Sequence, residues 1–271
     1  MHDRTAAAVK PLPSATVILI REGPYNPEVL MVQRNARATF GASYVFPGGI
    51  VDQYDRSAHI HCMHVSAEAA NKCLGLEDGG LDYFSAAIRE VFEETSVLFA
   101  RNSSGDWAFS NDIMSTAEID EIRRRLYLKE EYWPDILVRY ELNLACDSLY
   151  YCAFWVTPET EVRRFTTRFF VAVLPQGQYA RHDEKELINS RWMTAADALC
   201  AVRTGKMKMI HPTYSTLKDI AEFKFVSEIV DWAQQRSESG IAQLLPRFVK
   251  IDGKDRIVMP GDLHYPEDEG L

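Results

Sequence analysis

Residues 86–100, AAIREVFEETSVLFA, have the pattern of a helix that buries one face and presents carboxylates on another. Glu93 and Glu94 follow Glu90 by three and four residues, so the three side chains lie within about one helical turn of each other. At about 100° per residue the apolar side chains fall on a different, single arc. This arc consists of Ala87, Ile88, Val91, Phe92, Thr95, Leu98 and Phe99. The segment therefore predicts a core-packed helix with an acidic cluster on its open side.

An acidic cluster on a helix has two interpretations. The common one is a solvated surface. However, like charges at this spacing repel one another mildly, and a hard divalent cation needs such clustered oxygen ligands. Mg²⁺ prefers carboxylate and water oxygens and shares its coordination shell with substrate phosphates. The helix is thus either an acidic surface or a metal platform, and other parts of the sequence have to decide.

Charge and composition exclude several classes of protein. The 271 residues include 30 basic and 39 acidic side chains, which gives a net charge of −9. A chain this acidic is not expected to bind a nucleic-acid backbone, and an anionic substrate would need local arginines or a metal ion. No apolar run approaches the roughly 18 residues of a membrane span. The five cysteines form no CxxC motif, and the chain does not end in an S-K-L address, so we expect a cytoplasmic protein.

Strand and helix patterns alternate irregularly along the chain, which predicts an α+β protein. Asp82 is a candidate N-cap of the acidic helix, and Asp252-Gly253 is a candidate hairpin turn. We expect strands at 17–21, 29–34, 44–46, 149–156, 168–174 and 187–193. We expect helices at 66–74, 82–100, 194–204 and 214–236, and a helical pair within 115–145. No repeat or low-complexity linker divides the chain, so we expect one domain at 1–271.

Two motifs together resemble the Nudix box, whose pattern is G-x5-E-x7-R-E-U-x-E-E-x-G-U, where U is aliphatic. The first is VFPGG at 45–49, and the second is REVFEETSV at 89–97. Two positions depart from the pattern: Asp55 stands where the family has glutamate, and Ser96 stands where it has glycine. The resemblance implies a Nudix-type mixed sheet sandwiched by helices.

The two halves of this box are unusually far apart. Gly49 and Arg89 are separated by 39 residues where the pattern has 13, so the intervening loop is 26 residues longer. A long insertion at this point resembles the Nudix branch that includes the peroxisomal coenzyme A diphosphatase. Segments 154–175, 211–217 and 259–266 are also similar to that branch. We therefore expect a core at about 14–205, insertions at about 52–81 and 115–145, and an additional C-terminal helix and tail at about 206–271.

The resemblance also implies roles for individual residues. Gly49, Arg89 and Asp55 would be structural, with Asp55 or Asp82 as the partner of Arg89. A general base would come from the box, as Glu90, or from the later acidic loop, as Glu186. The implied ligands of Mg²⁺ or Mn²⁺ are Gly48, through its backbone carbonyl, Glu90, Glu93 and Glu94. The catalytic set is Glu90, Glu93, Glu94 and Glu186, and the substrate-binding set is Arg34, Arg37, Arg164 and Glu184, with Arg163 and Arg168 as further candidates.

The activity implied is metal-dependent hydrolysis of a nucleoside diphosphate linked to another group, with coenzyme A or acyl-CoA esters as the leading substrates. ADP-ribose, NADH or nucleotide sugars are alternatives, since the box recognises only a metal and a diphosphate. A Nudix-fold binding module without catalysis is a further alternative, which rests on the departures at Asp55 and Ser96. The segments outside the family core favour a homodimer, and we expect no nucleic-acid or membrane partner. The cluster His59, His61, Cys62 and His64 matches no common zinc spacing, and we expect it to be structural.

Overall fold

A mixed eight-stranded β-sheet forms the centre of the molecule. The computed structural model describes residues 9–35, 41–108, 115–181 and 187–266. The main path of the sheet has the order β10-β2-β1-β9-β8-β11, with β3 paired to β2 and β4 paired to β1. Its strands are β1 (Leu12–Arg21), β2 (Glu28–Arg34), β3 (Tyr44–Val45), β4 (Gly48–Ile50), β8 (Tyr150–Val156), β9 (Phe165–Val173), β10 (Leu187–Thr194) and β11 (Gln243–Leu244). The expected α+β class, with strands of mixed direction, is confirmed.

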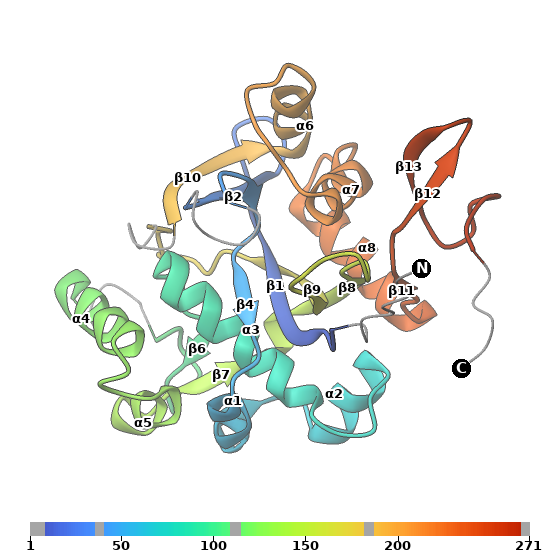
Figure 1. The fold of residues 1–271 in the computed structure, drawn as a ribbon. Coiled ribbons are helices and arrows are strands. Elements are labelled where there is room, and N and C mark those ends of the chain that lie inside the picture. Colours follow the sequence, from blue (N-terminus) through green and yellow to red (C-terminus); the bar gives the residue numbers. More distant parts are fainter. Residues whose placement is uncertain (1–8, 36–40, 109–114, 182–186, 267–271) are drawn as a thin grey trace.

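Helices cover both faces of this sheet (Figure 1). Alternation along β1 explains why: Val17 and Leu19 belong to one buried cluster and Ile18 and Ile20 to the other. On the first face lie α1 (Gln53–Ser57), α2 (Ala67–Leu74), α3 (Gly80–Thr95), α4 (Thr116–Tyr127) and α5 (Trp133–Arg139). On the second lie α6 (Ala195–Arg203), α7 (His211–Ile220) and α8 (Val226–Ser239). Both faces are therefore buried, as in a sheet sandwiched by helices.

Two small sheets stand apart from the large one. The first joins β5 (Cys62–Met63) and β6 (Ala100–Arg101) to β7 (Asn143–Ala145), in the order β5-β7-β6. The second is the hairpin of β12 (Arg247–Ile251) and β13 (Lys254–Val258). Its turn residues Asp252 and Gly253 both have positive φ, 51° and 75°, which confirms the expected hairpin. Two 3₁₀ turns, η1 (His59–His61) and η2 (Cys146–Ser148), complete the described elements.

Three local predictions are wrong. The acidic helix, expected to run to residue 100, ends at Thr95, because Ser96 takes a left-handed conformation at its C-cap, and Ala100 belongs to β6. The acidic helix starts earlier than expected: its N-cap is Gly79, with φ of 81°, and Asp82 lies inside the first turn. The long helix expected over 214–236 is two helices, α7 and α8, because the chain leaves the helical path between Ile220 and Val226. The Lys224 and Phe225 N–H groups in that gap donate to the Glu228 carboxylate at 2.6 and 3.1 Å. These bonds satisfy backbone donors at the N-terminus of a new helix, α8. By contrast, Thr194 caps α6 as expected, accepting the Asp197 N–H at 3.1 Å.

Candidate active site

The acidic helix α3 is held in the core by its apolar face. Ile88, Val91 and Phe92 are almost fully buried and belong to the same cluster as Val17 and Leu19 of β1. Burial of side chains of this size contributes about 1.5–3 kcal/mol each to folding. Helix α3 therefore cannot turn or slide without breaking the core, and its carboxylates have a fixed position relative to β1 and β4.

The Pro47-Gly48-Gly49 turn lies directly against these carboxylates. The Gly48 N–H donates to Glu94 Oε2 at 2.9 Å. A Cβ atom at Gly49 would lie 2.4 Å from the Glu90 carboxylate, so any other residue there would displace either that carboxylate or the turn. Gly48 has φ of 152°, and a Cβ there would lie 2.3 Å from the Ala15 carbonyl oxygen of β1. Both glycines thus allow the turn to approach α3 and β1 closely.

Arg89 ties the helix to the segment that follows this turn. Its Nε and Nη2 donate to the two oxygens of Asp55 at 3.0 and 2.9 Å, and Nη2 also donates to the Ile50 carbonyl at 2.9 Å. Its Nη1 donates to Glu90 Oε1 at 2.8 Å and to Glu93 Oε1 at 3.2 Å. The Arg89 side chain is 9% exposed and that of Asp55 is fully buried. One guanidinium therefore organises three carboxylates and a backbone turn.

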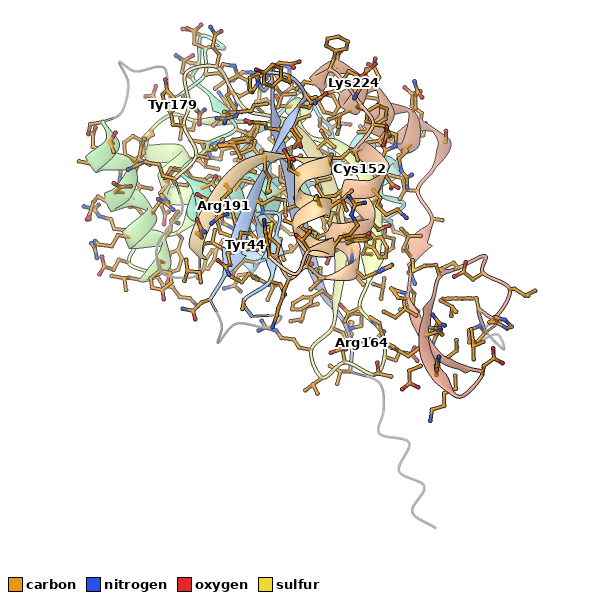
Figure 2. The ribbon with its side chains drawn as sticks, turned by 90° about the horizontal axis from the view of Figure 1, so that it is seen from above. Tyr44, Cys152, Arg164, Tyr179, Arg191 and Lys224 are labelled. Carbon is orange, nitrogen blue, oxygen red and sulfur yellow. The ribbon has the colours of Figure 1, made fainter. Side chains whose placement is uncertain are left out.

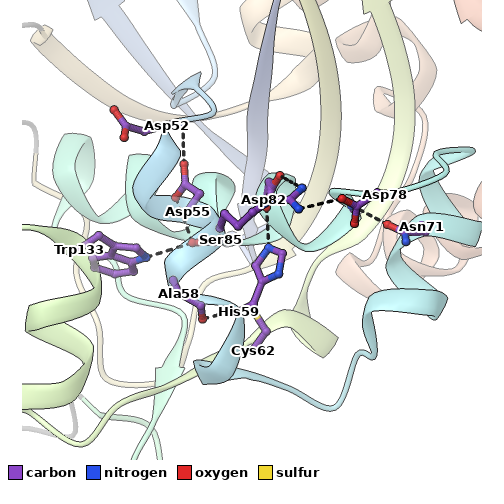
Figure 3. A network of polar contacts seen from close by, with 12 residues as sticks. Asp52, Asp55, Ala58, His59, Cys62, Asn71, Asp78, Asp82, Ser85 and Trp133 are labelled. Atoms are coloured by element: carbon purple, nitrogen blue, oxygen red, sulfur yellow. Dashed lines mark hydrogen bonds and ion pairs between the residues drawn. The ribbon is translucent and has the colours of Figure 1, made fainter.

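Asp55 is held by further polar contacts from the box insertion, α3 and α5 (Figure 3). It accepts the Asp52 N–H at 2.8 Å and the Ser85 hydroxyl at 3.0 Å, and Trp133 Nε1 donates to that same hydroxyl at 3.2 Å. These donors and the Arg89 guanidinium compensate the negative charge of the buried Asp55 carboxylate.

Asp82, the rival partner for Arg89, faces a different arginine. It accepts from Arg56 at 2.9 Å and lies 2.5 Å from Nε2 of His59 (Figure 3). The histidines of the insertion serve the same local structure, since His61 Nδ1 lies 3.1 Å from the Leu142 carbonyl. The expected structural role of the His59–His64 cluster agrees with these contacts.

The three glutamates of α3 differ in burial. Burial raises the pKa of Glu90 to about 7, with the Arg89 guanidinium opposing the rise and the Glu93 carboxylate adding to it. Glu94 is 5% exposed, and the Glu93 side chain is the most open of the three at 28%. A buried carboxylate beside a second one is costly unless a cation or hydrogen bonds compensate.

The donor chemistry of this cluster fits a divalent cation. Three carboxylates and the backbone of Gly48 line one cavity, and such oxygen donors suit Mg²⁺ or Mn²⁺. Among the described residues, no three acidic, histidine or cysteine groups already converge closely enough to hold a cation alone. Here Arg89 and the Gly48 N–H engage the carboxylate oxygens instead.

The carboxylates open into a cavity of about 1070 Å³. This is slightly above the roughly 300–1,000 Å³ usual for small-molecule sites, so the cavity is large enough for a sizeable ligand. The polar part of its lining includes Arg34, Glu90, Glu93, Glu94, Asp120, Arg123, Arg124 and Arg181. The apolar part includes Phe46, Trp155, Pro158, Phe165, Ile210, Pro212, Pro246, Phe248 and Ile257. The cavity therefore joins a charged region to an apolar one.

Only some of the candidate substrate-binding residues line the cavity. Arg34 lines the cavity, as does Arg163. The expectation for Arg164 is wrong: it is the last residue of the loop that joins β8 and β9 (Figure 2), where it is 6% exposed and donates to the Thr157 and Val9 carbonyls at 3.0 Å each. Arg168 is likewise buried, stacks 3.6 Å above the Phe154 ring and donates to the Leu74 carbonyl. Arg37, Glu184 and Glu186 lie outside the described residues.

Arg123 of α4 is a site residue that the sequence analysis missed. It lines the cavity, and its Nε donates to the Glu93 carbonyl at 2.9 Å and its Nη1 to the Ser96 hydroxyl at 2.7 Å. Ser96 is the C-cap of α3 with φ of 65°, the left-handed conformation that favours glycine. The serine that departs from the box pattern thus gives Arg123 an acceptor at the end of the acidic helix. No signal in the local sequence links residues 27 positions apart.

Residues 77–220 match the family model of the NUDT19 Nudix domain, which is more than half of the chain. The chain belongs to this Nudix family. The two departures from the Nudix box, at Asp55 and Ser96, are therefore variants within a Nudix hydrolase. Nudix hydrolases generally need divalent metal ions, which agrees with the donor chemistry of α3.

Relatives and solved structures agree with this family. The chain is 24% identical over 276 residues to acyl-coenzyme A diphosphatase NUDT19 of Xenopus laevis, covering 90% of this chain and 73% of that protein. It is 25% identical over 287 residues to the protein of the same name from Gallus gallus, covering 91% and 75%. The crystal structure of a Nudix hydrolase from Alicyclobacillus acidocaldarius superimposes with a TM-score of 0.68 at 25% identity, covering 83% of this chain and 97% of that one. Within the described residues, no helix is both long and apolar enough to span a bilayer.

Proposed function

We propose that this Nudix hydrolase cleaves the diphosphate of coenzyme A or of acyl-CoA esters. The observation that carries the proposal is the placement of Glu90, Glu93 and Glu94 beside the Gly48-Gly49 turn, at the wall of one large cavity. The names of the relatives from Xenopus laevis and Gallus gallus support coenzyme A as the substrate class.

The reaction adds water across the phosphoanhydride. The water oxygen forms a bond to one phosphorus, the bond from that phosphorus to the bridging oxygen breaks, and a base takes the proton. The products are two phosphate monoesters, 3′,5′-ADP and a phosphopantetheine compound. When bound, a divalent cation neutralises phosphate charge and acidifies the attacking water.

The residues of the chain would divide this work. Glu90, Glu93, Glu94 and the Gly48 carbonyl would hold Mg²⁺ or Mn²⁺. Arg34 and Arg123 at the cavity wall would bind the anionic diphosphate, because a guanidinium matches phosphate oxygens in pairs. Arg89 and Asp55 would position the acidic helix relative to the turn. The base would be Glu90 or Glu186.

A substrate panel tests this function. Purified protein with Mg²⁺ or Mn²⁺ is incubated with CoA, octanoyl-CoA, ADP-ribose and NADH, and kcat/KM is ranked across the panel. We expect the CoA compounds to rank first and to yield 3′,5′-ADP. A higher kcat/KM for ADP-ribose or NADH would assign the site to another diphosphate, and no turnover of any compound would contradict hydrolysis altogether.

Further parts of the proposal rest on the sequence. The scattered cysteines support a cytoplasmic setting, the acidic composition supports an enzyme independent of nucleic acid, and the segments outside the family core support a homodimer. Light scattering on a size-exclusion column measures the mass directly. A monomer mass at micromolar concentration would contradict the dimer.

A further inference from the structure

The C-terminal hairpin of β12 and β13 lies outside the large sheet and contributes to the lining of the cavity. It extends from the body of the molecule in both views (Figures 1 and 2). The preceding strand β11 pairs with β8, matching Leu244 with Trp155. Arg247 at the base of the hairpin then donates to Glu159, in the loop after β8, at 3.0 Å. The hairpin is therefore anchored next to Trp155, a residue of the cavity lining.

Two apolar side chains of this hairpin form a pair. Phe248 and Ile257 are directly opposite one another in the β12–β13 register, so they lie on the same face. Both line the cavity, although they are 48% and 46% exposed. Val258, the neighbour of Ile257 on the opposite face, is 5% exposed. The buried face thus holds the hairpin in place and the half-exposed face is available to a ligand.

The rest of this end of the cavity is also apolar. Its lining there is formed by Trp155, Pro158, Phe165, Ile210, Pro212 and Pro246. Trp155 is 4% exposed. The charged side chains nearby are Glu161 and Arg163, and the Arg163 guanidinium lies 5.3 Å from the Phe165 ring centre. Thr157 and His211 are the polar neighbours, and the His211 ring lies 5.6 Å from the Trp155 ring. Apolar residues therefore outnumber charged ones in this part of the lining.

We infer that Phe248 and Ile257 form the wall that receives the acyl chain of an acyl-CoA substrate. The inference rests on the proposed function, which places the diphosphate at the carboxylates of α3. The nucleotide half of the substrate is charged and pantetheine carries polar amides, so the acyl chain is the part that matches an apolar wall. Removing such a chain from water is favourable in proportion to the apolar area buried, which supplies the selectivity.

The test measures selectivity between two substrates that differ only in the acyl chain. kcat/KM is determined for octanoyl-CoA and for CoA with the wild type, Phe248→Ala, Ile257→Ala and the double variant. Phe225→Ala and Ile188→Ala are matched controls, because both side chains are exposed, at 60% and 50%, and lie outside the cavity lining as described. Thermal unfolding of each variant checks that the fold is retained.

We expect the ratio of the two kcat/KM values, octanoyl-CoA over CoA, to fall roughly fivefold to tenfold in the double variant, with smaller losses in each single variant. The controls should keep the wild-type ratio. An equal loss for both substrates would mean that the wall contacts the shared CoA portion, and an unchanged ratio would mean that it contacts neither. Either result overturns the acyl site while leaving the proposed hydrolysis intact. No turnover of either substrate by the wild type would overturn both.

Discussion

The two walls of the cavity are built differently. The wall formed by α3 is part of the core: Arg89 and Asp55 are buried, and five hydrogen bonds join Arg89 to Asp55, Ile50, Glu90 and Glu93. The wall formed by the hairpin is a two-stranded ribbon with half-exposed Phe248 and Ile257. The difference suggests a division of labour. Chemistry common to every substrate depends on a rigid element, whereas selectivity for one substrate depends on an appended one.

The largest effect should come from the carboxylates of α3. Glu93→Gln or Glu94→Gln keeps the size of the side chain but removes its negative charge, so cation binding weakens. We expect kcat to fall roughly 100-fold or more in either variant. Circular dichroism should show an unchanged fold. Wild-type turnover in both variants would remove the metal role assigned to this wall.

The next effect concerns the anchor of the same wall. Asp55→Asn leaves the buried Arg89 without its charged partner, and breaking a buried ion pair costs about 3–5 kcal/mol. We expect the free energy of unfolding to fall by about this amount, measured by urea denaturation. Arg56→Gln is the control, because Arg56 pairs with Asp78 and Asp82 on an exposed part of the insertion. An equal loss in the two variants would contradict the special role of the Arg89–Asp55 pair.

A glycine substitution tests how closely the turn must approach the helix. Gly49→Ala places a methyl group 2.4 Å from the Glu90 carboxylate, so either the turn or the carboxylate has to move. We expect the free energy of unfolding to fall by about 1–3 kcal/mol. We expect kcat to lose a larger fraction of its wild-type value than the free energy of unfolding does. Urea denaturation and steady-state kinetics measure the two. Normal kcat would show that the contact between the turn and Glu90 is dispensable.

The smallest effect should come from Arg123, at the C-terminal end of the acidic helix. Arg123→Gln removes the cation that α4 places beside the last turn of α3, together with its bonds to the Glu93 carbonyl and the Ser96 hydroxyl. We expect a loss of about 1 kcal/mol in the free energy of unfolding. Because Arg123 also lines the cavity, KM for the anionic substrate should rise. An unchanged KM with lowered stability would restrict Arg123 to capping the helix.

Much of the α3 wall could be predicted from the sequence because its information is local. Apolar periodicity placed Ile88, Val91 and Phe92 in the core, and the spacing of the glutamates placed them together. The start of the helix was mispredicted because Gly79 is its N-cap through backbone conformation alone, while Asp82 offered a better side-chain signal. Local sequence signals of this kind do not reveal helix boundaries that depend on tertiary contacts.

The rest of the site depends on contacts between distant segments. Arg164 looked suited to phosphate, yet it is bound by the carbonyl of Val9, 155 positions away. Arg123 reaches α3 from an insertion outside the box, and Phe248 reaches the cavity from the tail. Neither contact has a spacing that periodicity or a motif reveals. The sequence therefore indicates the chemistry better than it indicates the shape of the cavity.

The central claim is that α3 and the Gly48-Gly49 turn together bind the catalytic cation. An anomalous difference map of a crystal with Mn²⁺ and a nonhydrolysable CoA analogue tests it most directly. We expect Mn²⁺ beside the carboxylates of Glu93 and Glu94, in contact with the diphosphate of the analogue. Mn²⁺ bound elsewhere, with the diphosphate away from α3, would contradict the account.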